Sequence, residues 1–269
     1  ADMSRGLGDV YKRQAGMAFR WLRYWLLATD QHSLQAPFVY SFYENAVNSA
    51  PDRTKLLPVV KLKKQLLGNK KSISVTDFGA GKERLKQRAI GIIAKRSNQP
   101  KVSRLLFNSC KYLQPESILE LGTSLGLSTL HMVLAVPEAK VVTLEGCPET
   151  SKLAGEHFNQ LGATNVELVT GEISQTLPQV LSRLEKIDVL FMDANHRYQP
   201  TIEYFYQCQP KFHNQTLVII DDINWSGEMQ EAWLELKTSS KVSMSVDLFY
   251  AGILFFKPNL NKTQYILSW

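Results

Sequence analysis

The stretch that decides the fold is ILELGTSLGLST, residues 118–129. A short apolar run typical of a buried strand, residues 117–121, leads directly into a glycine turn, and a helix is expected at 128–136. Gly122 permits a tight turn and lets a ligand approach the backbone closely. The first turn of the helix leaves backbone N–H groups without partners inside the helix. The segment therefore predicts a strand–turn–helix unit whose turn can bind a ligand.

The alternation of strand and helix continues along the rest of the chain. Continuous apolar runs are typical of parallel strands that are buried on both faces, and their regular alternation with helices predicts a doubly wound α/β sheet. The expected strands are residues 117–121, 140–144, 166–169, 187–192 and 216–220, and the expected helices are residues 128–136, 148–161, 174–184, 198–209 and 228–237.

Two β-rich runs close the chain, residues 242–249 and 252–256, with only two residues between them. A helical crossover does not fit into so short a connection, so the two runs must form an antiparallel hairpin. The predicted fold is therefore a Rossmann-like sheet of seven strands, mostly parallel, with an antiparallel strand from the C-terminal hairpin. Dinucleotide-binding domains normally add a sixth parallel strand instead. This difference disfavours an NAD-dependent oxidoreductase, as does the lack of a Gly-x-Gly-x-x-Gly loop.

The composition is that of a globular protein. The 269 residues are 44% hydrophobic and 21% charged, close to the average for such proteins, which excludes a disordered, collagen-like or coiled-coil chain. The three cysteines are widely spaced and form no C-x-x-C pair, so neither a disulfide framework nor a zinc site is indicated. A reducing, cytoplasmic compartment is expected. No apolar run reaches the roughly 18 residues of a membrane-spanning helix.

The positive charge is concentrated in the first third of the chain. Residues 1–100 contain 18 Lys and Arg against 7 Asp and Glu, whereas residues 101–269 contain 13 against 18. Such an asymmetry can indicate a surface that binds nucleic acid or an anionic membrane. The basic clusters lack the interleaved aromatic residues of a platform for single strands. A solvated helical face is the favoured interpretation.

The amino-terminal region is expected to be a helical extension or lid, residues 15–100, on a main domain formed by residues 101–269. Residues 1–14 match nothing around them in pattern and are interpreted as a non-native or disordered segment. A second glycine loop, DFGAG at residues 77–81, follows a strand-like run. Because no series of strands and helices follows this loop, it is interpreted as a structural turn, with a lid over a cofactor as the alternative. Helices are expected at residues 19–27, 38–48, 59–67 and 82–95.

Polar side chains follow every predicted strand, at the edge where doubly wound sheets bind ligands. Glu145 ends the second strand, 23 residues after Gly122, a spacing that suits a carboxylate on ribose hydroxyls. A single acidic residue at a strand end is often only a helix cap. The occurrence of polar residues at successive strand ends, however, predicts a nucleoside-cofactor site. The other strand ends read GEISQ at 171–175, DANH at 193–196 and DDIN at 221–224.

The sequence resembles the class I S-adenosylmethionine-dependent methyltransferases over about its last 160 residues. ILELGTSLGLST is similar to the first motif of the catechol-type O-methyltransferases, and GEISQTLPQV at residues 171–180 is similar to their adenine-side loop and the helix after it. The C-terminal hairpin resembles the reversed last strand of that fold. The resemblance implies transfer of a methyl group from S-adenosylmethionine to a hydroxyl oxygen of a small molecule. Residues 1–100 match no specific motif.

The resemblance also implies which residues contact the cofactor. Gly122, Thr123 and Ser124 are expected to face its methionine part, and Glu145 its ribose. Glu172, Ile173 and Ser174 are expected around the adenine. The full implied set is Glu120, Gly122, Thr123, Ser124, Gly126, Ser128, Glu145, Gly171, Glu172, Ile173, Ser174 and Asp193.

The metal-dependent relatives hold Mg²⁺ with acidic residues at two strand ends, and the matching positions here are Asp193, Asp221 and Asp222. Asp222 departs from the Asn of the family, and His196 stands where those relatives have a Lys that takes the substrate proton. His196 and Asp193 are the candidate catalytic residues, because an imidazole near neutrality can act as a general base. Clustered carboxylates repel one another, and oxygen ligands suit Mg²⁺. The alternative is that Asp193 contacts only the cofactor and that Asp221 and Asp222 cap the next helix.

Three other functions were weighed against a small-molecule O-methyltransferase. A nucleic-acid methyltransferase that attacks exocyclic amines is expected to carry an Asn/Asp-Pro-Pro-Tyr/Phe type loop after the fourth strand, where this chain has DANH. Nucleic acid is therefore disfavoured as a partner. A non-catalytic binding module is disfavoured by the intact set of polar strand ends, and an oxidoreductase by the topology. A homodimer is compatible with the sequence.

Overall fold

The computed structural model describes residues 16–77, 84–97, 99–258 and 262–269. The segment 1–14 and residues 78–81 of the second glycine loop lie outside the described residues, so these two interpretations stay predictions.

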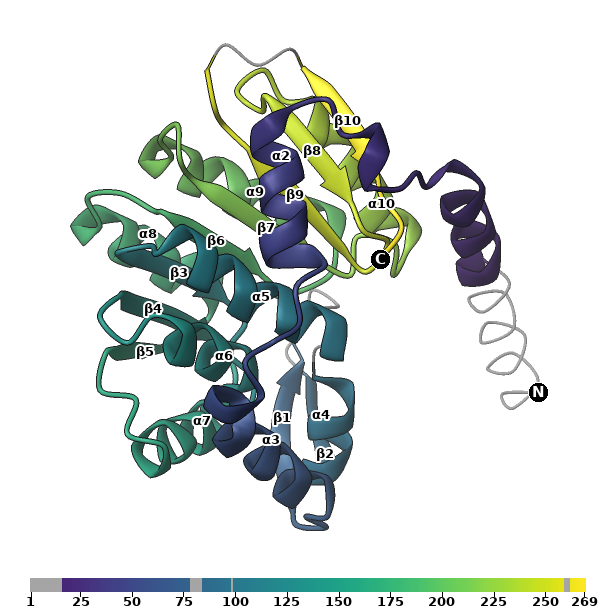
Figure 1. Ribbon diagram of the computed structural model, residues 1–269. Coiled ribbons are helices and arrows are strands. Elements are labelled where there is room, and N and C mark those ends of the chain that lie inside the picture. Colours follow the sequence, from purple (N-terminus) through teal and green to yellow (C-terminus); the bar gives the residue numbers. More distant parts are fainter. Residues whose placement is uncertain (1–15, 78–83, 98, 259–261) are drawn as a thin grey trace.

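An eight-stranded sheet forms the centre of the molecule, in the order β10-β8-β9-β7-β6-β3-β4-β5 (Figure 1). Five strands are parallel and occupy the positions expected from their apolar runs: β3 (Ser117–Leu121), β4 (Lys140–Glu145), β5 (Val166–Thr170), β6 (Val189–Met192) and β7 (Leu217–Asp221). The chain runs outward from β3 to β5 and then returns to β6 on the other side of β3. This reversal opens a crevice at the carboxyl ends of β3 and β6, where such folds bind ligands.

The predicted C-terminal hairpin is confirmed. β9 (Ala251–Phe255) is antiparallel both to β7 and to β8 (Met244–Asp247). The sheet has one strand more than the seven predicted, because β10 (Thr263–Ile266) adds to its edge in parallel with β8. The residues of β10 are half-buried or exposed. An edge strand of this kind lacks the continuous apolar run that marks a buried strand.

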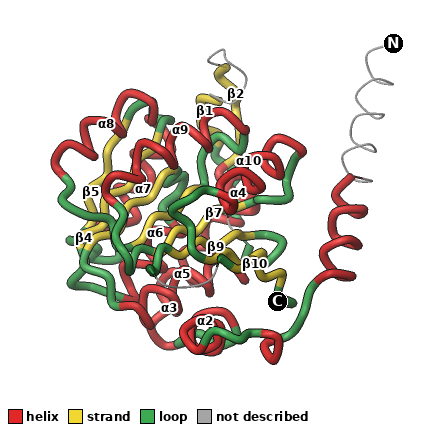
Figure 2. Tube along the Cα trace, turned by 90° about the horizontal axis from the view of Figure 1, so that it is seen from above, coloured by secondary structure: helices red, strands yellow, loops and turns green. Residues whose placement is uncertain are grey.

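Helices cover both faces of the sheet and give two apolar cores (Figure 2). Successive strand residues point to opposite faces, so Ile118 joins the core beneath one layer and Leu119 the core beneath the other. The first layer contains α5 (Pro100–Leu113), α6 (Leu127–Ala135) and α7 (Pro148–Gln160), and the second contains α8 (Ile173–Arg183), α9 (Tyr198–Cys208) and α10 (Gly227–Thr238).

The amino-terminal region packs on the first layer and shares its core. Val39 of α2 (Pro37–Phe42) and Val59 of α3 (Arg53–Leu67) are buried in that core. The outer face of α3 exposes Lys61 and Lys64, which agrees with the interpretation of a solvated basic face. Residues 16–27 are helical, followed by the short turns η1 (Gln31–Ser33) and η2 (Tyr43–Val47) around α2.

The helix predicted at residues 82–95 is wrong in its first half. Residues 84–89 form β2 (Arg84–Ala89), which pairs antiparallel with β1 (Ser72–Asp77), and only then does α4 (Ile90–Arg96) begin. Pairing with β1 decides the conformation, since the local sequence RLKQRA has no strong preference of its own. The extension is thus a set of helices with a two-stranded hairpin rather than entirely helical. Among the described residues, no helix is both long and apolar enough to cross a bilayer.

Candidate cofactor site and active site

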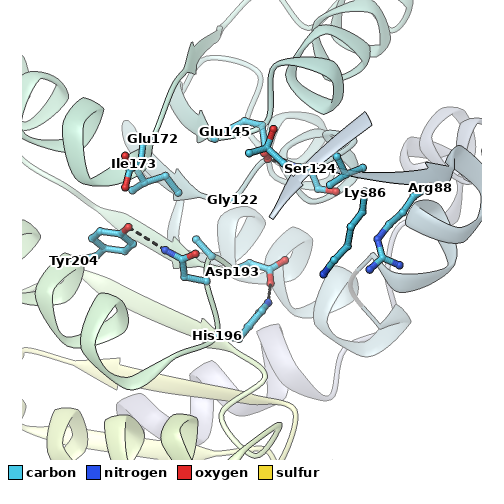
Figure 3. A pocket seen from close by; sticks show the side chains of 15 residues that line it. Lys86, Arg88, Gly122, Ser124, Glu145, Glu172, Ile173, Asp193, His196 and Tyr204 are labelled. Atoms are coloured by element: carbon cyan, nitrogen blue, oxygen red, sulfur yellow. Dashed lines mark hydrogen bonds and ion pairs between the residues drawn. The ribbon is translucent and has the colours of Figure 1, made fainter. Parts of the chain in front are cut away.

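A cleft of about 350 Å³ lies at the carboxyl ends of β3, β4 and β6, between the sheet and the β1–β2 hairpin (Figure 3). Its volume is in the range of small-molecule sites, about 300–1,000 Å³. The sheet contributes the turn after β3, the end of β4 and the loop after β6, whereas α8 and the hairpin form opposite walls. The predicted residues that line this cleft are Gly122, Ser124, Glu145, Glu172, Ile173, Asp193 and His196.

Gly122 forms the floor of the cleft where β3 ends. Its φ of 101° is in the region that only glycine adopts without strain. A Cβ atom at this position would lie 2.2 Å from the carbonyl oxygen of Asp193. The glycine therefore lets the turn after β3 pack directly against the loop after β6.

Glu145 is fixed by the backbone around it. Its Oε2 accepts the N–H of Ser124 at 2.6 Å, and its Oε1 accepts the N–H of Cys147 at 2.8 Å. Burial raises the pKa of Glu145, and these backbone hydrogen bonds oppose that rise. Each carboxylate oxygen can accept a second hydrogen bond. Glu145 therefore presents preoriented acceptors to the cleft, which suits two neighbouring hydroxyl groups.

The wall opposite the hairpin comes from α8 and α9. Ile173 is buried at the start of α8, and Glu172 lies beside it. Tyr204 of α9 also lines the cleft, and its hydroxyl accepts a hydrogen bond from Asn195 at 3.1 Å. An apolar side chain and an aromatic ring near a carboxylate make a suitable pocket for a flat heterocycle.

The loop after β6 brings Asp193 and His196 together. The Nε2 of His196 lies 3.3 Å from the Oδ1 of Asp193, and the two side chains keep 32% and 19% of their surface exposed. Asn195 and His196 have φ values of 63° and 41°, so the loop turns back on itself after Asp193. The turn points the imidazole into the cleft, next to an acid that can stabilise its charged form.

The acidic residues at the end of β7 lie behind this pair. Asp221 is buried, and its pKa is raised well above the usual range by burial and by the neighbouring charges of Asp193 and Asp222. The pKa of Asp222 is also raised, mainly by burial, and His196 opposes the rise. The donor chemistry, carboxylate oxygens alone, fits Mg²⁺. The arrangement of the side chains does not fit Mg²⁺, since no three Asp, Glu, His or Cys side chains converge as metal ligands within the described parts of the chain.

A second, aromatic cavity of about 560 Å³ lies on the far side of Asp222. It is formed between the helix at residues 16–27 and the loops after β7 and β8. Arg20 helps to attach that helix, because its Nε donates to the carbonyl of Asn224 at 2.9 Å. The lining includes Met17, Trp21, Asp222, Trp225, Phe249 and Tyr250.

Not every residue implied by the resemblance faces the cleft. Glu120 is fully buried beneath it, where Thr143 Oγ1 donates to its Oε2 at 2.6 Å and Thr129 donates to the same oxygen. Gly126 caps the start of α6 and packs against the Phe158 ring, 2.6 Å from the position of a Cβ. These two residues lie beneath the cleft rather than in its lining, and their role as direct contacts stays a prediction.

Four other residues that the resemblance implies as cofactor contacts lie at different places around the cleft. Thr123 and Ser128 line a smaller chamber that continues from the cleft along the start of α6. Gly171 makes the turn after β5, where its N–H donates to the carbonyl of Glu145 at 2.9 Å. Ser174 is exposed on the outer surface of α8. Neither Gly171 nor Ser174 is among the residues that line the cleft, and their contact with the cofactor stays a prediction.

The sequence reasoning missed the contribution of the hairpin. Val75, Thr76, Lys86 and Arg88 line the cleft. Val75 belongs to the strand-like run before the second glycine loop, whereas Lys86 and Arg88 lie in the helix expected at residues 82–95. Pairing with β1 makes a strand of RLKQRA and puts Lys86 and Arg88 on one face, but this local sequence carries no strong signal for a strand. Tyr204 was also missed, because a tyrosine inside a helix is indistinguishable from a core residue in the sequence.

Comparisons with known proteins agree with this geometry. Residues 119–223 match a family described as a methyltransferase domain. A catechol O-methyltransferase of Niastella koreensis is 33% identical over 135 residues, which cover 49% of this chain and 59% of that protein. The mouse catechol O-methyltransferase domain-containing protein 1 is 28% identical over 140 residues, 51% and 53% of the two chains. The chain thus spans little more than half the length of these curated relatives.

Solved structures share the fold at low sequence identity. The O-methyltransferase from Bacillus cereus, in complex with S-adenosylhomocysteine, has a TM-score of 0.56 at 17% identity, covering 76% of this chain and 92% of that one. A methyltransferase of Podospora anserina bound to S-adenosylhomocysteine has a TM-score of 0.58 at 15% identity, covering 82% and 94%. Residues 119–223 thus match a methyltransferase domain, and the sheet with its reversed strand has the fold of these solved methyltransferase structures.

Proposed function

We propose that the protein transfers a methyl group from S-adenosylmethionine to a hydroxyl oxygen of a small molecule. The observation that carries the proposal is the position of the Asp193–His196 pair, 3.3 Å apart, in the same cleft as the fixed carboxylate of Glu145. One end of the cleft suits a nucleoside, and the other offers a base to an acceptor.

In this proposal the cofactor lies along the carboxyl edge of the sheet. Ile173 and Tyr204 border the adenine, and Glu145 accepts hydrogen bonds from the ribose hydroxyls. Gly122 and Ser124 face the methionine part. Bound S-adenosylmethionine would supply an electrophilic methyl group on a positively charged sulfur.

The protein's own contribution is to position the acceptor and to remove its proton. His196 accepts the hydroxyl proton as the oxygen attacks the methyl group, which yields a methyl ether and an imidazolium ion. Asp193, next to Nε2, stabilises that imidazolium and orients the ring. General-base catalysis of this kind contributes a factor of about 10²–10⁴, and holding the two reactants in line contributes further.

The aromatic cavity beside Asp222 supports a flat acceptor such as a phenol or catechol. Trp21, Trp225 and Phe249 offer the apolar surface that an aromatic ring buries on binding. Asp222 lines this cavity and His196 lines the cleft, and the charge of His196 opposes the rise in the pKa of Asp222 that burial causes. The names of the curated relatives, catechol O-methyltransferases, agree with such an acceptor class.

Mg²⁺ remains part of the proposal, with Asp193, Asp221 and Asp222 as its ligands. Burial, together with the neighbouring charges of Asp193 and Asp222, raises the pKa of Asp221, and a divalent ion would relieve the repulsive part of that cost. Binding requires the side chains to turn from their present directions, since they do not converge. No step of the mechanism is therefore assigned to a metal.

A cytoplasmic location and a homodimer also stay proposals. Cys110, Cys147 and Cys208 are all free and buried, which suits a reducing compartment. The homodimer can be tested by light scattering during size-exclusion chromatography.

Two measurements test the function. Calorimetric titration with S-adenosylhomocysteine should show binding to one site per chain. Incubation with S-adenosylmethionine and a panel of phenols, catechols and sugars should give products that are heavier by one methylene unit. An absence of cofactor binding by the folded protein would overturn the proposal.

A further inference from the structure

The β1–β2 hairpin turns one of its faces toward the cleft. Alternate residues of a strand share a face, so Lys86 and Arg88 of β2 point the same way. Their partners across the hairpin are Val75 opposite Lys86 and Ile73 opposite Arg88. Figure 3 shows both basic side chains extending from the hairpin toward the space beside Asp193 and His196.

Arg88 also borders the smaller chamber, of about 240 Å³, that continues from the cleft. This chamber lies between α4 and the start of α6. Arg88 and Arg96 are on its hairpin side, and Thr123, Ser124 and Ser128 are on its sheet side. Ser124, Asp193 and His196 line both spaces, so one elongated ligand can occupy them together.

The cleft and the chamber share Arg88 and Asp193 but differ in their other charged side chains. Glu145 and Glu172 line the cleft near the nucleoside end and do not border the chamber. At the other end are two guanidinium groups, which stay protonated at every physiological pH. Among the described residues, neither Arg88 nor Arg96 forms an ion pair. The chamber has two guanidinium groups against the single carboxylate of Asp193, so it is suited to the anionic end of a ligand whose other end is a nucleoside.

We propose that Arg88 and Arg96 bind the carboxylate of the methionine part of S-adenosylmethionine, an inference that rests on the proposed function. The guanidinium group suits this task because its planar N–H groups match a carboxylate in a bidentate manner. The hairpin and α4 thereby complete the cofactor site from outside the methyltransferase domain. The amino-terminal extension then acts in cofactor recognition rather than as a separate module.

The test compares two ligands that differ only by the carboxylate. S-adenosylhomocysteine has it, and its decarboxylated analogue, S-adenosyl-3-thiopropylamine, does not. Binding of both is measured by calorimetry to the wild-type chain, Arg88→Gln, Arg96→Gln and the double variant. Lys95→Gln is the matched control, because it removes one positive charge from an exposed position of α4 that borders neither space.

The wild-type chain should prefer S-adenosylhomocysteine over the analogue by roughly 10–100-fold, the range for a hydrogen bond to a charged group. Arg88→Gln should lower the affinity for S-adenosylhomocysteine by a similar factor and leave that for the analogue almost unchanged. Arg96→Gln should have the same effect to a smaller degree, since Arg96 is the more exposed. Lys95→Gln should change neither of the two affinities. Arg88→Lys should restore part of the preference for S-adenosylhomocysteine over the analogue.

Each other outcome counts against the inference in a different way. Equal losses for both ligands would mean that the arginines only support the hairpin. Unchanged S-adenosylhomocysteine affinity together with a raised KM for the acceptor would assign them to the acceptor instead. If the wild-type chain binds neither ligand, the proposed function fails; if it binds both equally well, only this inference fails.

Discussion

The side chain of Glu145 joins the ends of two neighbouring strands, because its Oε2 accepts the backbone N–H of Ser124 at 2.6 Å. The acid at the end of β4 thus fixes the turn after β3 and also lines the cleft. A residue that the sequence suggests only as a ribose ligand therefore also shapes the floor of the site.

Glu145→Ala should weaken binding of S-adenosylhomocysteine by about 1–3 kcal/mol, the cost of leaving buried hydrogen-bonding groups unpaired. Calorimetric titration measures this loss, and circular dichroism verifies that the variant is folded. Glu149→Ala, at an exposed position in the first turn of α7, is the control. An unchanged affinity in folded Glu145→Ala would move the ribose site elsewhere.

Gly122→Val should abolish cofactor binding and lower the melting temperature. The new side chain would start 2.2 Å from the carbonyl oxygen of Asp193, so the turn after β3 and the loop after β6 must separate. Gly227→Ala is a suitable control, because nothing lies within 4 Å of the added Cβ there. Retained binding by Gly122→Val would show that this turn is not the cofactor-binding element.

His196→Ala should lower kcat by roughly 10²–10⁴, the span for a lost general base, with little change in cofactor affinity. The reason is that the imidazole touches the reacting hydroxyl rather than the adenosine part. Initial rates with an acceptor from the screen measure the effect, and His32→Ala, on an exposed turn, is the control. A variant with the rate of the wild type would remove His196 from the mechanism.

Glu120 should make stability fall as the pH rises. Burial raises its pKa from 4.5 to about 7, so between these values the folded state binds more protons than the unfolded state. The free energy of unfolding therefore decreases with rising pH across that window, by up to about 3 kcal/mol from this group. Other buried acids act in the same direction, so the informative quantity is the difference between the wild type and Glu120→Gln. Urea unfolding at pH 5 and pH 8 measures it, and parallel curves for the two proteins would contradict the prediction.

Millimolar Mg²⁺ should raise the melting temperature of the wild-type chain. Burial and the charges of Asp193 and Asp222 raise the pKa of Asp221, and a bound cation relieves the repulsion among these carboxylates. Asp222→Asn should reduce the rise in melting temperature, and an excess of chelator should abolish it without affecting S-adenosylhomocysteine binding. Differential scanning calorimetry with and without the ion tests this. A melting temperature of the wild-type chain that Mg²⁺ leaves unchanged would eliminate the metal.

Much of the fold follows from local patterns in the sequence. The strands β3 to β7 lie where the apolar runs predict them, because a strand buried on both faces needs apolar residues throughout. The gap of three residues between β8 and β9 is too short for a helix, so the reversal of β9 is also determined locally. Gly122 and Glu145 are recognisable because strand ends of a parallel sheet meet at one edge whatever the loops do.

Tertiary structure decided what local patterns leave open. RLKQRA becomes β2 because β1 pairs with it, and this pairing brings Arg88 into a cleft that its own sequence neighbourhood does not predict. Glu120 and Gly122 are two residues apart, yet one is sealed beneath the cleft and the other forms its floor, because α6 packs over the former. The sequence thus determined which helices and strands form and at which edge of the sheet the polar strand ends lie. The packing of distant segments determined which side chains face the cofactor, since that direction depends on partners far away in the chain.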